Sequence, residues 1–263
     1  MINLEKIKKD WLKSEKNQQK FIGWDFSYLE GKSEMDPLPW DYSKLVLNLL
    51  GSEMKLLDMG TGGGELLDSL NHPHQLTSVT EGWEKNYALL LQKLLPLGVN
   101  VKFVGDDDFL DFPDDSFDII INSHESFLVS EVQRVLKPGG YFITQQVGDI
   151  NGVLLASKLI PDFQKLSFNL HLSTVETELK ETGFKILYQN ESYPKQKFYD
   201  MDGLIYYVRT IPWEFPNFTV NTHFDRLVNL NDELKRNGFV LNLEHRFVIV
   251  AQLNTKNMLN NLK

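Results

Sequence analysis

The sequence contains no cysteine, carries fewer basic than acidic side chains and has no long hydrophobic run. Without cysteine, disulfides, thiolate nucleophiles and cysteine-ligated zinc are all excluded. A membrane-spanning helix needs about 20 consecutive apolar residues, and no apolar run approaches that length. The first residues, MINLEKIKKDWLKSEK, form a lysine-rich amphipathic pattern without the apolar centre of a signal peptide. We therefore expect a cytoplasmic protein with no membrane partner.

The shortage of positive charge also bears on the substrate. Lys and Arg together number 27 and Asp and Glu 36, a formal net charge of −9. Proteins that hold nucleic acid gain most of their affinity by neutralising phosphates with a basic surface. No run of more than two basic residues occurs here. The composition thus disfavours nucleic acid and is typical of a protein that acts on a small molecule.

From residue 55 to residue 148, apolar strand-like runs alternate with amphipathic helical patterns. This alternation predicts an α/β fold of the Rossmann-like, doubly wound kind, with a mostly parallel sheet between helices. The expected strands are KLLDM (55–59), QLTSVTE (75–81), VKFVGD (101–106), FDIIINS (117–123) and YFITQQV (141–147), and the expected helices cover 65–71, 84–95 and 126–136.

Beyond residue 148 the pattern changes. A helix is expected over 174–182, strands over 184–193 and 239–253, and about 45 aromatic-rich residues lie between those strands. Such a length without structure is rare in a compact domain, so we expect an inserted lid. The predicted organisation is a helical cap (1–50), a core (51–193), a lid (194–238), and a final core strand with a tail (239–263).

The segment LLDMGTGGGELL (56–67) places a glycine loop between a strand and a helix. A dinucleotide loop needs a third glycine where this sequence has Glu65, and a phosphate-binding Walker loop would end in Gly-Lys-Ser/Thr. An NAD-dependent oxidoreductase is therefore disfavoured. Asp58 stands just before the loop, and two carboxylates around a glycine turn suit a ligand that carries positive charge.

At this point the chain resembles the class I S-adenosylmethionine-dependent methyltransferases. Four motifs carry the resemblance, in the family's order, across residues 55–148. They are the loop DMGTGGG (58–64), the strand end SVTE (78–81), the acidic segment GDDDFLDFPDDSFD (105–118) and EVQRVLKPGG (131–140). The resemblance implies a seven-stranded sheet whose last strand is antiparallel. Residues 202–213 with His245-Arg246-Phe247 resemble an uncharacterised bacterial subgroup of these enzymes.

The resemblance also implies roles for residues around S-adenosylmethionine. Asp58 and the backbone of the loop would hold the methionine part, Glu81 the ribose hydroxyls and Asp106 the adenine amino group. Trp83 would cover the adenine face, and Asp107 would offer its backbone N–H. The full expected cofactor set is Asp58, Gly60, Thr61, Gly62, Glu81, Gly82, Trp83, Asp106, Asp107 and His124.

His124 and Glu125, the two candidate catalytic residues, follow the fourth expected strand, at the edge where the methyl group should point. Methyl transfer needs mainly in-line positioning, and a histidine assists as a base where the acceptor is a hydroxyl or an acidic carbon. The alternative is that His124 only lines the site. For the acceptor, we name Trp40, Tyr206, Arg209 and Trp213 as candidate contacts, against the alternative that they pack in the core or form a salt bridge.

The string DDFLD (107–111) matches the DDxxD pattern that holds magnesium in terpene synthases. Those enzymes are all-helical, so we predict no metal here. The predicted reaction is in-line methyl transfer from S-adenosylmethionine to a small molecule, leaving S-adenosylhomocysteine. A nucleic-acid or protein acceptor, and a cofactor-binding module without catalysis, remain alternatives, although the Asn/Asp-Pro-Pro-Tyr/Phe motif of base methyltransferases is absent.

Overall fold

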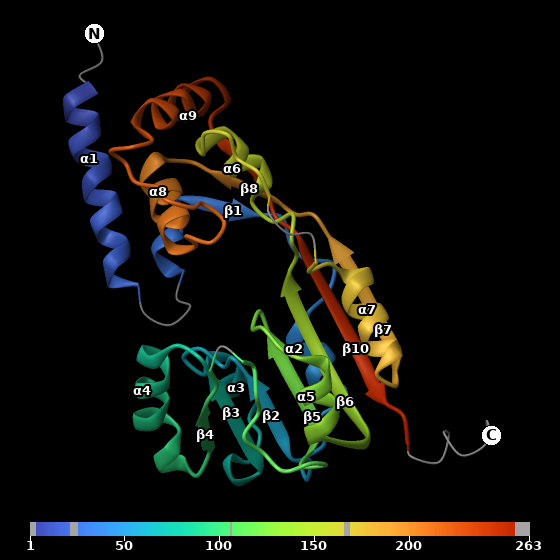
Figure 1. Cartoon of the computed structure of the whole chain (residues 1–263). Coiled ribbons are helices and arrows are strands. Elements are labelled where there is room, and N and C mark those ends of the chain that lie inside the picture. The colour runs from blue at the N-terminus through green and yellow to red at the C-terminus, as the bar shows by residue number, and fades with distance from the viewer. Residues whose placement is uncertain (1–3, 22–25, 106, 166–168, 256–263) are drawn as a thin grey trace. The chain divides into compact units, whose positions relative to one another are not determined.

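The computed structural model describes residues 4–21, 26–105, 107–165 and 169–255 (Figure 1). The chain divides into two compact units. Unit 1 takes residues 1–38, 149–168 and 192–245, and unit 2 takes residues 39–148, 169–191 and 246–263. Within the described ranges, no helix is both long enough and apolar enough to cross a membrane.

Unit 2 is built on a seven-stranded sheet. Its strands lie in the order β4 (Asn100–Phe103), β3 (Thr77–Glu81), β2 (Leu56–Met59), β5 (Phe117–Ser123), β6 (Leu136–Val147), β10 (Arg246–Leu253) and β7 (Phe184–Ser192). Counted along the chain within this sheet, the order is 3-2-1-4-5-7-6. The pairs from β4 to β6 are parallel, whereas β10 runs antiparallel to β6. The predicted Rossmann-like sheet with an antiparallel last strand is confirmed.

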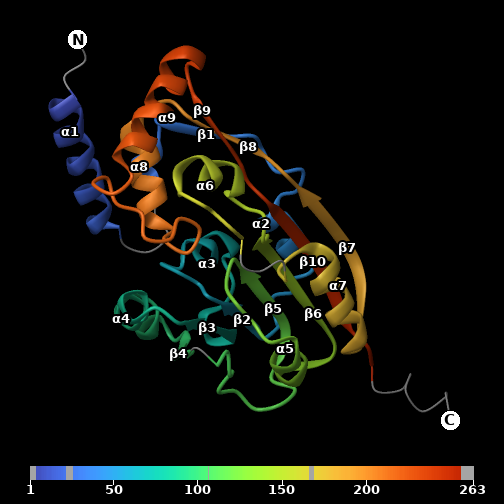
Figure 2. The ribbon, with the colours of Figure 1, turned by 45° about the horizontal axis from the view of Figure 1, so that its top comes forward.

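Helices cover both faces of this sheet because successive strand residues point to opposite sides. Leu57 and Ile120 pack toward α5 (Val129–Val135) and α7 (Leu172–Glu181), on the face turned to the viewer in Figure 2. Leu56 packs on the other face. The helices on that face are α2 (Tyr42–Leu47) and α3 (Glu65–Leu70), and α4 (Glu84–Lys93) packs over β3. Two short 3₁₀ helices, η3 (His74–Leu76) and η4 (Leu95–Leu97), precede β3 and follow α4 in the sequence.

Unit 1 combines a three-stranded antiparallel sheet with helices. The sheet order is β1 (Ser33–Met35), β8 (Lys195–Phe198) and β9 (Val240–Leu243). The helical elements are α1 (Leu4–Asn17), η1 (Gln18–Lys20), η2 (Ser27–Leu29), α6 (Val153–Leu159), α8 (Met201–Thr210) and α9 (Phe224–Asn237). Trp11, Leu204 and Leu227, from three of these helices, belong to one buried apolar cluster, so this unit has a core of its own.

The boundaries drawn from the sequence differ from this division. The expected cap and lid share unit 1, because β1 pairs with β8 and α1 packs on α8. Residues 42–47 belong instead to unit 2, as α2. The single strand expected over 239–253 is two strands, β9 and β10, in different sheets. Between them, Glu244 accepts from the Tyr207 hydroxyl (2.7 Å) and the His245 N–H donates to Asn151 Oδ1 (2.8 Å). At this point the polar groups of the run are therefore bonded to side chains.

Candidate functional site

The loop after β2 is held in shape by glycine conformations and by β3. Gly60, Gly62 and Gly64 have φ values of +65°, +62° and +82°, in the left-handed region where a residue with a Cβ is strained. The N–H groups of Gly60 and Thr61 donate to the Thr80 carbonyl at 3.1 and 3.2 Å. The loop therefore presents bare backbone at the carboxyl ends of β2 and β3, where doubly wound folds bind ligands.

Asp58 is brought to this edge as the third residue of β2 and is only 2% exposed. Among the described residues, its Oδ2 has no hydrogen-bond partner, and neither does the buried Thr61 hydroxyl oxygen. Burial raises the pKa of Asp58 to about 7, and the Glu81 charge adds to this rise. A buried carboxylate oxygen without a donor is unfavourable, so the site suits a ligand that brings a positively charged donor.

Glu81 ends β3 and connects the glycine loop with the start of α4. Its Oε2 accepts from the Gly62 N–H at 3.0 Å and its Oε1 from the Trp83 N–H at 2.9 Å, with Asn86 Nδ2 3.5 Å from Oε2. Burial raises the pKa of this carboxyl, although the N–H donors oppose the rise. Glu81 thus presents two acceptor oxygens at the position where the sequence places a diol-binding acid.

His124 and Glu125 follow β5. His124 is exposed and has a φ of +71°, while its N–H donates to the Gln145 carbonyl at 2.9 Å. A left-handed non-glycine residue is strained and is found preferentially at functional sites. Glu125 lies across the glycine loop: a Cβ added at Gly60 would overlap its Cβ and Oε2. Burial, then the charges of Glu81 and Asp108, raise the pKa of Glu125 to about 7.

The predicted adenine contacts lie on two loops. Asp106 is outside the described residues. Asp107 is exposed, and its Oδ1 accepts from the Phe109 N–H at 3.3 Å. Trp83 is 37% exposed at the N-cap of α4, with the Lys85 Nζ 5.7 Å from its ring centroid. A Cβ at Gly82 would lie 3.3 Å from the Val104 carbonyl, so these two loops approach closely.

The acidic run after β4 has protein partners. Arg134 donates to the carbonyls of Leu110 and Phe112, both at 2.7 Å, and binds Glu131 and Asp114. Of the DDFLD string, Asp108 accepts from the Ser126 hydroxyl at 2.8 Å and Asp111 pairs with Lys102 at 2.8 Å. The Ser126 contact also links this run to the loop that carries Glu125. Asp108, Asp111 and Asp114 are therefore held by side chains of the same unit.

Sequence reasoning did not identify two further supports of the site. Lys93, in the last turn of α4, donates to the Gly63 carbonyl at 2.9 Å and to Asp68 at 2.8 Å, and so fixes the glycine loop from outside. Gln146 donates to Asn122 Oδ1 at 2.8 Å and to the Glu125 carbonyl at 3.1 Å. Neither residue lies in a recognisable motif, because each acts across about 20 to 30 residues of sequence.

The candidate acceptor contacts lie in different units. In unit 2, Trp40 Nε1 donates to Gln145 Oε1 at 3.3 Å, and Gln145 Nε2 donates to the Ser123 hydroxyl at 2.9 Å, next to His124. In unit 1, Tyr206 is buried against the Tyr28 ring, with 4.2 Å between centroids. The other two candidates of unit 1 are also placed: Arg209 donates to the Phe218 carbonyl at 2.6 Å and lies 3.5 Å from Glu15, and Trp213 is 65% exposed. Substrate contact by these residues stays a prediction.

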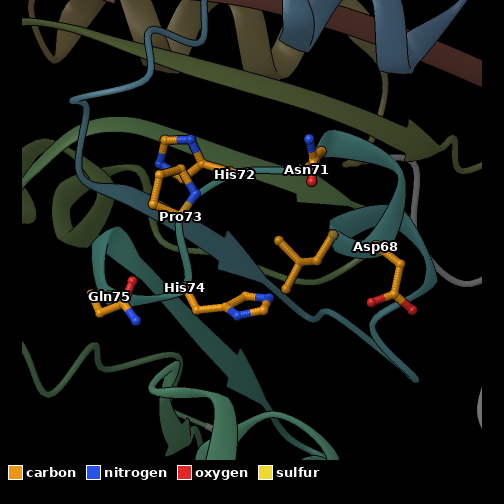
Figure 3. Close-up of a pocket in the computed structure, with 7 residues that line it drawn as sticks. Asp68, Asn71, His72, Pro73, His74 and Gln75 are labelled. Carbon is orange, nitrogen blue, oxygen red and sulfur yellow. The ribbon is translucent and has the colours of Figure 1, made fainter.

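A hollow of about 420 Å³ lies elsewhere on unit 2 (Figure 3). It is formed by the second half of α3 and the loop that follows, at the amino-terminal approach to β3. Its lining is Leu67, Asp68, Asn71, His72, Pro73, His74 and Gln75. His72 Nε2 is 2.9 Å from the Met54 carbonyl, and Asp68 is paired with Lys93. The residues assigned to the candidate site are not among those that line this hollow.

Comparison with known proteins agrees with this geometry. Residues 57–144 match the family model of a methyltransferase domain. The biotin biosynthesis bifunctional protein BioHC of Teredinibacter turnerae is 29% identical over 159 residues, 52% of this chain but only 28% of that protein's length.

Two solved structures show the same fold. A protein of Bacillus halodurans C-125 assigned as a methyltransferase has a TM-score of 0.56 at 18% identity, covering 82% of this chain and 99% of its own. The YcgJ protein of Bacillus subtilis has a TM-score of 0.55 at 19% identity, covering 81% and 98%. The family match and the sheet order together identify residues 57–144 as a methyltransferase domain on a Rossmann-like fold.

Proposed function

We propose that this enzyme binds S-adenosylmethionine on the glycine loop and transfers the methyl group to a small-molecule acceptor. The observation that carries the proposal is the Asp58 carboxylate, whose Oδ2 is buried without a partner among the described residues, directly before a left-handed glycine turn. The ammonium group of the cofactor's methionine part would supply the missing donor. When bound, the cofactor provides a methyl group on a sulfonium sulfur that is already activated for displacement.

The chain's own residues would hold and orient the cofactor. Asp58 and the open backbone of Gly60 and Gly62 would take the methionine part. Glu81 would accept from the ribose hydroxyls; in the ligand-free structure it already receives two backbone N–H groups, so its oxygens are oriented in advance. This assignment excludes a phosphate-bearing ligand, because Asp58 and Glu81 would repel a pyrophosphate.

At the acceptor end, the His124 imidazole is neutral, because desolvation and the Arg246 charge lower its pKa to about 3. His124 directly follows β5 with a left-handed φ of +71°, and its N–H donates to the Gln145 carbonyl. A neutral imidazole can accept a hydrogen bond from a hydroxyl acceptor, but a pKa this low makes it a weak base, so His124 would mainly orient the acceptor. Two linked hydrogen bonds, from Trp40 to Gln145 and from Gln145 to Ser123, add aromatic and polar groups next to His124 in the sequence. The net charge of −9 disfavours a nucleic-acid acceptor.

The test has a binding step and a turnover step. By calorimetry, S-adenosylmethionine and S-adenosylhomocysteine should bind, NAD should not, and Asp58→Ala or Glu81→Ala should weaken both ligands at least tenfold. Incubation with methyl-labelled cofactor and a cell extract should then place the label in the small-molecule fraction. Binding that survives both substitutions would refute the site, and label found only in protein or nucleic acid would refute the small-molecule acceptor.

A further inference from the structure

The Glu125 side chain lies against Gly60 of the glycine loop. We propose that Glu125 makes the site selective for cationic S-adenosylmethionine over its neutral product, S-adenosylhomocysteine. This inference rests on the proposed function, and it adds a role for a residue that sequence motifs place only at the methyl-bearing edge. Three contacts define the position: overlap with a Cβ built at Gly60, a 4.0 Å approach of Oε1 to a Cβ built at Gly82, and an N–H bond to Asn122 Oδ1 at 3.3 Å.

These contacts place the carboxylate between the two halves of the cofactor site. Gly60 belongs to the loop that would hold the methionine part, and Gly82 directly follows Glu81, which would hold the ribose. In S-adenosylmethionine the sulfur atom joins the methionine chain to the ribose. A carboxylate that spans from Gly60 to Gly82 is therefore next to the point where the two parts are joined, which is where the positive charge of the sulfonium resides.

The charge at sulfur is the feature by which the site could distinguish S-adenosylmethionine from S-adenosylhomocysteine. The cofactor and its product carry the same ammonium, carboxylate, ribose and adenine groups, and they differ by a methyl group and one positive charge at sulfur. Asp58 and Glu81 would meet groups that both ligands share. The unpartnered Asp58 Oδ2 independently indicates a cationic ligand at this loop. Glu125 is thus the carboxylate whose interaction would disappear once the methyl group has left.

The arrangement of Glu125 is fixed by its backbone. Its N–H donates to Asn122 Oδ1, and its carbonyl accepts from Gln146 Nε2 at 3.1 Å. Two side chains of the sheet therefore hold this residue against the glycine loop. A charge held in place in a partly buried site interacts more strongly than an exposed one, because water screens it less.

The experiment compares dissociation constants of both ligands by calorimetry, for the wild-type chain and for Glu125→Gln. We expect the variant to lose about tenfold in affinity for S-adenosylmethionine and less than about threefold for S-adenosylhomocysteine, the size of one charge interaction in a partly buried site. Glu53→Gln, which removes an exposed carboxylate at the opposite end of β2, should leave the ratio unchanged. Glu125→Asp keeps the charge and should retain most of the preference.

The outcomes separate the two proposals. If neither ligand binds the wild-type chain, the proposed function fails. If both bind but Glu125→Gln leaves their affinity ratio at the wild-type value, the selectivity inference alone is refuted. Circular dichroism establishes that the variants fold; should Glu125→Gln not fold, the ratio measured for the wild-type chain between pH 8 and pH 6 decides.

That pH series has a defined expectation. The groups facing Glu125 are Glu81 at the end of β3, Asp108 after β4 and the adjacent Ser126 hydroxyl, with Asp58 on the neighbouring strand. Protonation of Glu125 below pH 7 should reduce the preference for the sulfonium, so the ratio should fall toward pH 6. Protonation of Asp58 would weaken both ligands together and leave the ratio unaffected. A ratio that stays constant across this range would refute the inference.

Discussion

Replacing Asp58 by asparagine should make the ligand-free protein more stable while it removes cofactor binding. In the folded chain, burial raises the pKa of this carboxyl from 3.8 to about 7. Because the folded-state pKa is the higher one, the group's stabilising contribution is complete below about pH 4 and is lost as the pH rises through 7. Each pKa unit corresponds to about 1.4 kcal/mol, so the ionised carboxylate destabilises the fold by up to about 4 kcal/mol at pH 8.

The asparagine side chain has a similar shape without the charge. Asp58→Asn should therefore raise the free energy of unfolding at pH 8 by a substantial part of that amount, and the gain should shrink steadily toward pH 4.5. Urea denaturation of the ligand-free protein at several pH values measures this. Asp111→Asn is the matched control: it loses the same charge at a side chain that is 80% exposed, and surface pairs of this kind contribute about 0–1 kcal/mol.

Measuring the melting temperature with and without S-adenosylmethionine connects this stability effect with cofactor binding. Saturating S-adenosylmethionine should raise the melting temperature of the wild-type chain at pH 8 through mass action, and should have little effect on Asp58→Asn. An asparagine variant that is no more stable than wild type at pH 8, or whose advantage does not depend on pH, would refute the assignment of a buried, unpartnered carboxylate. Such a trade between stability and activity is expected where a strained group serves a ligand.

Three further predictions concern the supports of the site. Gly60→Ala should destabilise the fold by about 2–4 kcal/mol, because the new side chain would be strained at a left-handed φ and would overlap Glu125. Gly98→Ala, with a φ of +95° but only ordinary contacts, should lose about 1–2 kcal/mol. Urea denaturation compares the two variants, and equal losses would contradict the overlap. Lys93→Met should weaken S-adenosylhomocysteine binding about threefold to tenfold by releasing the Gly63 carbonyl, and unchanged affinity in calorimetry would show that the loop keeps its shape without it. Arg134→Ala should lower the free energy of unfolding by about 2–3 kcal/mol, because it removes a charged donor from two carbonyls and two carboxylates. A loss below 0.5 kcal/mol, on the order of a surface substitution, would contradict the network.

Much of the α/β core was predictable, because strands and helices of this kind are set by apolar patterns within short stretches of sequence. The helix expected over 65–71 is α3 (Glu65–Leu70), and the one expected over 84–95 is α4 (Glu84–Lys93). The continuous apolar strand FDIIINS is β5, buried along most of its length. In contrast, the run 239–253 looks uniformly strand-like in the sequence. Where it divides, the His245 N–H donates to Asn151 and Glu244 accepts from Tyr207, residues about 40 to 90 positions away in sequence.

By itself, the sequence determined the parts of the site whose requirements are local. Glycine spacing sets the left-handed turn, because only glycine adopts those φ values without strain, and Asp58 and Glu81 each end or nearly end a strand, because parallel strands present their last residues at one edge. Only the tertiary structure decided that Asp58 keeps a buried oxygen without a partner in the described part of the chain, that Lys93 fixes the loop and that Glu125 lies across Gly60. Those contacts join separate elements, and their side chains meet only when the sheet and its helices are packed.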